Sequence, residues 1–283
     1  NILLKACNEH KTVDTYAKML WSTDKNSEYK LIKCTIILFF ELYRYFNNKV
    51  DKRYDAFFAS IISKEEPRLP DEIRIISWNY DYEFEKAFMK YALSATEDIH
   101  SIYDELNVIH KNSIPVDLKN KFRIIKVNGT TGFYDTNQKL TLGLNLPNFH
   151  RDKDIADMSW KDIMPLFINY NKYAGKNSKY IPAISFEWEK DDDGSLKKAI
   201  TECTSMSRAL VVIGYSFPTF NREMDTYILQ SLKLQSGDTQ VYIQDADYYS
   251  IQSKIERFIK KDLTTFIHQE SNLDEFYLPH EFR

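Results

Sequence analysis

The first 128 residues of this 283-residue chain contain no glycine, and the whole chain contains only seven. Glycine allows backbone N–H groups to approach phosphate groups closely, which is why many nucleotide sites begin with a glycine-rich loop. No loop of that kind can be formed by this part of the chain. The sites that the sequence offers must be built from other residues.

Cysteine is scarce as well. The three cysteines, Cys7, Cys34 and Cys203, lie far apart and show no C-x-x-C spacing. This pattern excludes a disulfide framework and gives no support to a zinc site, so we expect no metal and a reducing, cytoplasmic setting.

Excess positive charge and long apolar runs are also missing. The chain has 38 basic and 41 acidic residues, a formal net charge of -3, so charge does not suggest nucleic acid as a partner. The longest apolar run, Cys34 to Phe40, is shorter than the roughly 20 residues that a membrane span needs, so we expect a buried helix there and no membrane attachment. No signal peptide is visible, which agrees with a cytoplasmic protein.

Strand-like and helix-like segments alternate along the chain after a helical first part. The apolar, β-branched runs predict strands at 73–78, 122–127, 181–188, 209–213, 240–243 and 264–268. Unbroken apolar strands alternating with helices predict an α/β fold with a mostly parallel sheet covered on both faces. We therefore expect one domain over 1–283, with a helical segment at 1–70, an α/β core at 71–132 and 181–270, and an insertion at 133–180.

Ligands of open parallel sheets bind at the carboxyl ends of the strands, so the residues after each strand are the candidates for a site. Trp78-Asn79-Tyr80-Asp81 follows the first predicted strand. Asn supplies a donor and an acceptor and Asp an acceptor, so this pair can hold a sugar hydroxyl or orient a water molecule. The alternative is a turn with Asp81 as the cap of the next helix.

A second strand end carries Asn128-Gly129-Thr130-Thr131-Gly132. Its glycines let backbone N–H groups approach a ligand, and its threonines add hydroxyl groups. A plain loop is the alternative.

The third and fourth strand ends have similar chemistry. Gly214-Tyr215-Ser216, with Asn221 close behind, joins an apolar strand to a helix, which suits a ribose or a phosphate; the alternative is a tight turn. Asp245 follows the strand at 240–243 and can hold a ribose diol, whereas Asp247 is expected to cap the next helix.

Taken in order, these motifs resemble those of the sirtuin-like family. Asn79-Tyr80-Asp81 resembles the T-x-N-x-D element, and Lys126-Val127-Asn128-Gly129 resembles the K-L-H-G element. Val212 to Phe217 resembles the G-T-S element in the G-Y-S-F form of bacterial sirtuin-like defence proteins, and Ile243 to Asp247 resembles the segment that contacts the adenosine ribose. Thr12 to Ala17 is similar to an early helical segment of the same bacterial proteins, so the likeness covers roughly residues 10 to 260.

The resemblance implies a Rossmann-like domain that binds NAD and cleaves the bond between nicotinamide and ribose. In the bacterial defence members the acceptor is water, and loss of NAD stops phage spread. The resemblance implies catalytic roles around Asn79, Asp81 and Asn128, and assembly as a homo-oligomer or within a larger defence complex. The cofactor-binding residues implied are Trp78, Gly129, Thr130, Gly214, Tyr215, Ser216, Asn221 and Asp245.

Asn79 would position the water or the nicotinamide ribose, and Asp81 would support its loop. Gly214 and Ser216 would face the ribose-phosphate part, and Asp245 the adenosine side. The chain has none of the zinc cysteine pairs of deacylating sirtuins, so hydrolysis is favoured over deacylation.

Two departures from the family pattern leave the activity open. The G-A-G-x-S loop is absent from this sequence, so it either lies upstream of Asn1 or is lost. Asn128 stands where the family has its catalytic histidine, and an asparagine side chain cannot accept a proton near neutral pH. His110 or His150 could instead fold into the site. The two hypotheses are an NAD glycohydrolase and a catalytically silent module that binds NAD or ADP-ribose or acts as a scaffold.

Overall fold

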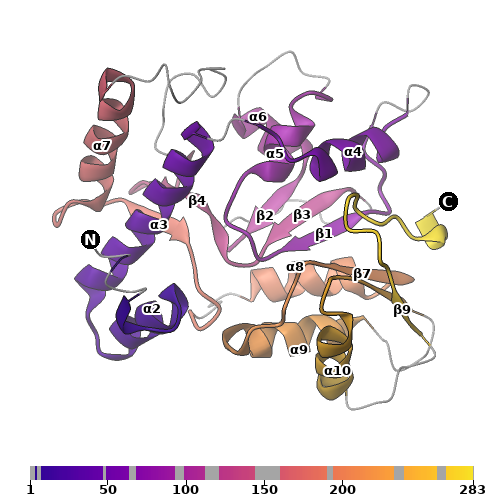
Figure 1. Ribbon diagram of the computed structural model, residues 1–283. Helices are drawn as coiled ribbons and strands as arrows, with labels where there is room; N and C mark the ends of the chain where they lie inside the picture. The colour runs from indigo at the N-terminus through magenta and orange to yellow at the C-terminus, as the bar shows by residue number, and fades with distance from the viewer. Residues whose placement is uncertain are drawn as a thin grey trace.

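The computed structural model describes residues 4, 8–46, 49–63, 68–92, 99–111, 121–143, 160–189, 194–232, 239–259 and 266–282. They form a mixed α/β structure with three three-stranded sheets (Figure 1). The α/β class predicted from the sequence is confirmed. The prediction of one sheet is not met in these ranges, because the strands divide into two parallel sheets and one antiparallel sheet.

The helical first part has the expected character in its described residues. It contains α2 (Val13–Ser22), α3 (Asn26–Phe46) and α4 (Lys52–Ile61). The Thr12 hydroxyl accepts a hydrogen bond from the backbone N–H of Thr15 and so caps α2. The buried residues of α2 form a hydrophobic core with residues of α3, α7 and β6.

The first parallel sheet has the strand order β1-β3-β2. Its strands are β1 (Arg74–Ser77), β2 (Val108–His110) and β3 (Arg123–Lys126), and α5 (Glu83–Phe88) and α6 (Ile99–Glu105) lie between β1 and β2 in the chain. Alternate residues of β3 face opposite sides of the sheet: Ile124 packs with α4, α5 and α6, and Ile125 packs with α8. Figure 1 shows these helices on the two sides.

The insertion predicted at 133–180 does not match the structure, because parts of it belong to an antiparallel sheet that begins before residue 133. This sheet consists of β4 (Gly129–Tyr134), β5 (Leu140–Leu142) and β6 (Ile181–Ile184), in the order β5-β4-β6. The helices α7 (Trp160–Ala174) and α3 pack against it. The strand predicted at 181–188 therefore ends at Ile184 and belongs to this sheet rather than to the parallel one. The strand β4 was not predicted, because Gly-Thr-Thr-Gly lacks the apolar pattern of a buried strand.

The second parallel sheet completes the fold. Its strands are β7 (Ala209–Ile213), β8 (Gln240–Gln244) and β9 (Ile267–Gln269), in that order. The helices α8 (Ser195–Thr204), α9 (Arg222–Ser231) and α10 (Tyr248–Ile259) pack on it, a short 3-10 helix (Thr219–Asn221) leads into α9, and another (His280–Phe282) lies near the C-terminus.

The two parallel sheets share one hydrophobic core. Ile125 and Val127, at the end of one sheet, lie in the same buried cluster as Val212 and Ile243 of the other, and α8 contributes Ile200 between them. β1 and β7 are edge strands of these two sheets. Each of these two strands pairs with only one other strand in the described part of the chain.

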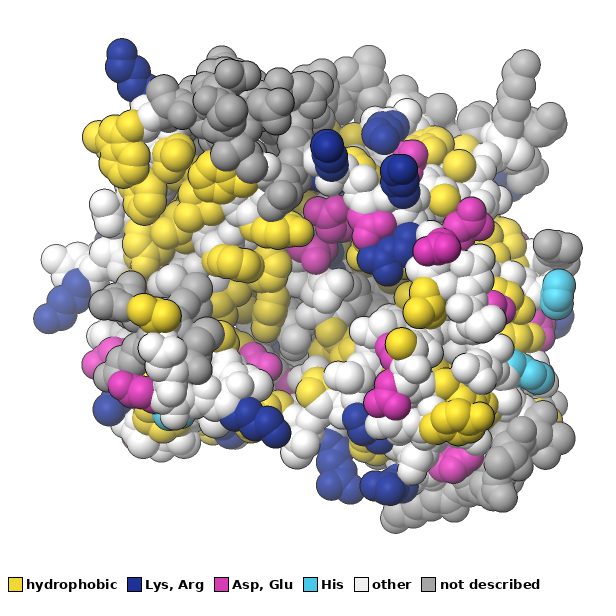
Figure 2. Space-filling view, viewed as in Figure 1, with side chains coloured by type: hydrophobic (Ala, Val, Ile, Leu, Met, Phe, Trp, Pro, Cys, Tyr) yellow, Lys and Arg dark blue, Asp and Glu magenta, His cyan; other side chains and the backbone are white. Residues whose placement is uncertain are grey.

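The surface over α3 and α7 is strongly apolar, as Figure 2 shows. Large exposed side chains there are Phe39, Tyr43, Trp160, Met164 and Ile168. In the ranges that the structure describes, no helix has both the length and the apolar character needed to cross a membrane.

Candidate functional site

The carboxyl ends of β1 and β7 meet through two aromatic rings. Trp78 follows β1 and Tyr215 follows β7, and their rings stack with centroids 5.4 Å apart and planes inclined by 4°. Stacked aromatic rings attract one another beyond the area that they bury. The first and third motifs of the sequence are therefore in direct contact.

Asn128 joins the second motif to this pair. It lies in the turn between β3 and β4 and is only 8% exposed. Its Nδ2 donates to the carbonyl oxygen of Trp78 at 3.3 Å, and its own carbonyl oxygen accepts from the N–H of Ser185 at 2.9 Å. Its Oδ1 is buried and has no hydrogen-bond partner among the described residues. A buried acceptor without a partner is costly, so this atom is a candidate contact for a ligand.

A second polar network holds Tyr215 in place. The Tyr215 hydroxyl donates to Oδ1 of Asp225 at 2.9 Å and accepts from Nδ2 of Asn221 at 2.9 Å. Asp225 is 2% exposed, and burial raises its pKa to about 7, with Glu187 adding to the shift and the Tyr215 hydrogen bond opposing it. Asn221 thus contacts the Tyr215 hydroxyl. Asp225 was not predicted from the sequence; a buried acid in the first turn of α9 becomes visible only when the packing is known.

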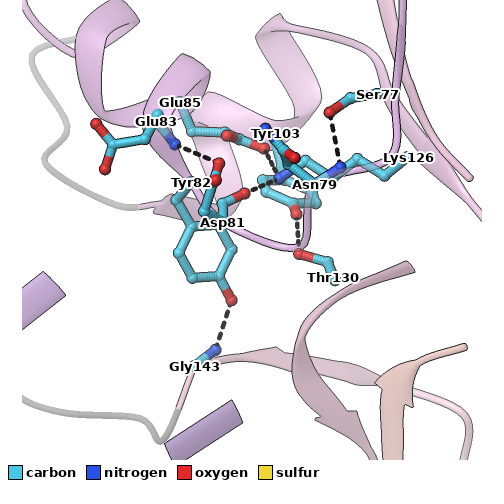
Figure 3. A network of polar contacts seen from close by, with 10 residues as sticks. All are labelled: Ser77, Asn79, Asp81, Tyr82, Glu83, Glu85, Tyr103, Lys126, Thr130 and Gly143. Carbon is cyan, nitrogen blue, oxygen red and sulfur yellow. Dashed lines mark hydrogen bonds and ion pairs between the residues drawn. The ribbon is translucent and has the colours of Figure 1, made fainter. Parts of the chain in front are cut away.

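Hydrogen bonds to neighbouring residues hold the loop of Asn79 and Asp81 in place (Figure 3). Asn79 is exposed, and its backbone N–H donates to the Ser77 hydroxyl at 3.2 Å. Oδ1 of Asp81 accepts from the N–H of Glu83, the first residue of α5, at 3.2 Å, although the N-cap position of this helix is Tyr82 rather than Asp81. The carbonyl oxygen of Asp81 accepts from Nζ of Lys126.

The buried ammonium group of Lys126 forms an ion pair with Glu85. Its Nζ lies 2.6 Å from Oε1 of Glu85, and both side chains are almost fully buried. Burial raises the pKa of Glu85, and the Lys126 ammonium opposes that shift. This pair connects β3, α5 and the Asn79 loop. The sequence motif contains Lys126 but gives no sign of Glu85 as its partner.

Gly129 and Thr130 lie inside β4 rather than in an open loop. Gly129 has φ +76°, and a Cβ atom there would lie 2.0 Å from the carbonyl oxygen of Ala183. Thr130 is fully buried, and its hydroxyl is hydrogen-bonded to that of Tyr103. The close approach of β4 to β6 therefore explains why residue 129 is a glycine, and no bound ligand is needed to explain it.

Gly214, Ser216 and Asp245 lie at the ends of the neighbouring strands β7 and β8. Gly214 is exposed, with φ +57°, and its N–H donates to the carbonyl oxygen of Gln244 at 3.2 Å. Ser216 is exposed, and its carbonyl oxygen accepts from Nζ of Lys254 at 2.6 Å. Oδ1 of Asp245 accepts from the N–H of Asp247 at 2.8 Å, just before α10.

A cleft opens beside Asn128. A cavity of about 370 Å³ is lined by Val127 and Ser185, which flank Asn128, and by residues from the loop after β6 and from the first turns of α8 and α9. A second cavity, of about 580 Å³, shares Glu187, Lys197 and Glu223 with the first. Both volumes fall within the range of small-molecule sites.

His110 does not supply a proton acceptor to this cleft. It is 3% exposed, and its Nδ1 lies 2.8 Å from the hydroxyl of Tyr134 and 2.9 Å from the carbonyl oxygen of Lys111. Burial lowers its pKa to about 4, so the imidazole is neutral near pH 7. His150 lies outside the described residues.

No protein-family model and no curated protein sequence matches this chain. Within the described ranges, His, Cys, Asp and Glu side chains form no group of three or more that could hold a metal ion. The function of this region must therefore be inferred from its geometry and from the motifs at the strand ends.

Proposed function

We propose that this chain binds NAD at the carboxyl ends of β1 and β7 and hydrolyses it to nicotinamide and ADP-ribose. The observation that carries the proposal is the contact set of Trp78, Tyr215 and Asn128, which unites three motifs from distant parts of the chain beside one cleft. Carboxyl ends of parallel strands are where open α/β sheets bind nucleotides.

The chemistry of these strand ends suits such a ligand. The buried Oδ1 of Asn128 needs a donor, which a ribose hydroxyl or the carboxamide of nicotinamide can supply. The exposed Asn79, one residue beyond Trp78, offers both a donor and an acceptor to a ribose or a water molecule. Ser216 and Asp245, at the ends of β7 and β8, offer acceptors to the remainder of a dinucleotide.

The resemblance to bacterial sirtuin-like defence proteins supports a biological role for this reaction. We propose that the chain acts as an antiviral effector that depletes NAD in the cytoplasm, alone as a homo-oligomer or within a larger assembly. A catalytically silent NAD or ADP-ribose module is the second candidate. The observation that favours it is Asn128 at the position of the family's histidine, together with the buried, neutral His110.

Two assays on the purified protein separate these functions. Release of nicotinamide from NAD is followed by chromatography, and binding of ADP-ribose is followed by calorimetry. Hydrolysis predicts release that Asn79→Ala abolishes and that Asn177→Ala, in an exposed turn after α7, leaves unchanged. Binding without release indicates the silent module. Absence of both binding and release contradicts the NAD proposal altogether.

A further inference from the structure

Glu187 is a carboxylate held at the wall of the cleft. It lies in the loop after β6 and lines both cavities. It faces the first turn of α9, where the backbone N–H of Met224 lowers its pKa. A helix N-terminus favours an anion, so this turn stabilises the charged carboxylate.

The backbone around Glu187 connects it to Asn128. Ser185, two residues earlier, donates its N–H to the carbonyl oxygen of Asn128 at 2.9 Å. Val127, on the other side of this contact, lines the same cavity as Ser185 and Glu187. Glu187 therefore lines a cavity next to Asn128, whose own side chain lies behind the lining residues Val127 and Ser185.

Charged and titratable groups from four directions face Glu187. They are Glu223 and Asp225 of α9, Lys197 of α8, Lys18 of α2 and Tyr215 after β7. Burial raises the pKa of Glu187, Glu223 raises it further, and Lys18 and Lys197 lower it. A carboxyl group with a raised pKa is a stronger proton acceptor than an exposed one.

We infer that Glu187 is the general base of the reaction, taking the proton that Asn128 cannot take; this inference rests on the proposed hydrolysis. A water molecule attacks C1′ of the ribose that carries nicotinamide. The bond between C1′ and the ring nitrogen breaks, and its electron pair leaves with nicotinamide, which becomes neutral. The water proton passes to the Glu187 carboxylate and then to solvent. The sum is NAD⁺ and water giving nicotinamide, ADP-ribose and a proton.

Two neighbouring acids are less suited to the role. Asp225 is 2% exposed, lines neither cavity and is hydrogen-bonded to Tyr215. The Glu223 side chain is 79% exposed and lies 3.6 Å from Lys197. Glu187 alone of the three combines access to both cavities with a partly buried carboxylate.

The test compares turnover of NAD with binding of ADP-ribose in four proteins. Relative to wild type, Glu187→Gln should lower kcat by about 10²–10⁴-fold and leave the ADP-ribose Kd within about twofold. The control Glu202→Gln, on the exposed side of α8, should change neither. Glu187→Asp keeps a carboxylate with shorter reach and should retain part of the activity. The kcat of wild type and Glu187→Asp should fall at acidic pH, and that of Glu187→Gln should not.

Each outcome decides a different point. If wild type releases no nicotinamide, the proposed hydrolysis fails and the general base with it. If wild type turns over and Glu187→Gln has the same kcat, only the assignment of Glu187 is wrong. If Glu187→Gln loses ADP-ribose binding together with turnover, Glu187 holds the ligand or the cleft and is not the base. If the Gln variant does not fold, an Asp variant without the acidic fall in kcat overturns the assignment.

Discussion

The ammonium nitrogen of Lys126 lies 2.6 Å from Oε1 of Glu85, and neither side chain is more than 2% exposed. The same nitrogen donates to the carbonyl oxygen of Asp81. One cation therefore joins a strand of the parallel sheet, the helix that follows β1 and the loop that carries Asn79 (Figure 3). The loop that carries Asn79 is therefore tied to a charge pair that is almost fully buried.

Replacing Lys126 alone should destabilise the protein, because Glu85 would then be buried without a partner. Lys126→Met leaves the Glu85 carboxyl group buried without its cation, which typically costs about 3–5 kcal/mol of the free energy of unfolding. The double variant Lys126→Met with Glu85→Leu should recover most of that loss. Urea denaturation measures the free energy of unfolding of wild type, the single variant and the double variant. A single variant as stable as wild type, or a double variant less stable than the single one, contradicts this account of the pair.

Gly129 should tolerate no side chain. A Cβ atom there meets the carbonyl oxygen of Ala183 at 2.0 Å, so Gly129→Ala must push β4 away from β6. Gly194→Ala is the matched control, because Gly194 also has positive φ but has no atom within 4 Å of the added carbon; its cost should be about 1–2 kcal/mol. Thermal and urea unfolding should show a loss for Gly129→Ala larger by at least about 2 kcal/mol. Equal losses count against the described contact between the strands.

Asp225 should make stability depend on pH. Its pKa is about 7 in the folded protein and near the ordinary value of 3.8 when unfolded, so the folded state holds an extra proton between these values. Its stabilising contribution is complete below about pH 4 and is lost as pH rises through 7. Asp225→Asn stays neutral, so its stability relative to wild type should rise from pH 4 to pH 7 by up to about 4 kcal/mol. A difference that stays flat across this window contradicts the buried, raised carboxyl group.

The stack of Trp78 and Tyr215 should appear as an energetic coupling. A double-mutant cycle with Trp78→Leu and Tyr215→Leu is expected to give about 0.5–1.5 kcal/mol in the free energy of unfolding. A control cycle pairs Trp78→Leu with Tyr249→Leu, an exposed tyrosine on α10, and should be additive. A coupling no larger than that of the control means that the rings do not meet in solution.

Local sequence patterns were sufficient for the strands with apolar, β-branched residues. The strands β1, β3, β7 and β8 lie where those runs predicted them. β2 was missed because three residues carry too little periodicity, and β4 because its glycines and threonines look like a loop. The division into three sheets depends on which edges pair, and pairing is not encoded in any single segment.

The site shows the same limit. Trp78, Asn128 and Tyr215 were predicted at strand ends, and the structure brings Trp78 into contact with each of the other two. Glu187 and Asp225 were not predicted, because their chemistry comes from burial and from neighbours far away in the chain. Asp81 and Asp245 accept local hydrogen bonds in the turns just before α5 and α10, and the N-cap of α5 is Tyr82 rather than the predicted Asp81.

Hydrogen exchange of the protein with and without saturating ADP-ribose tests the central claim most directly. The account predicts slower exchange of backbone amides at 77–81, 127–129 and 213–217, at the ends of β1, β3 and β7, and unchanged exchange in α3 and α7. Binding without protection at these strand ends, or with protection confined to other surfaces, contradicts a nucleotide site at the carboxyl ends of β1 and β7.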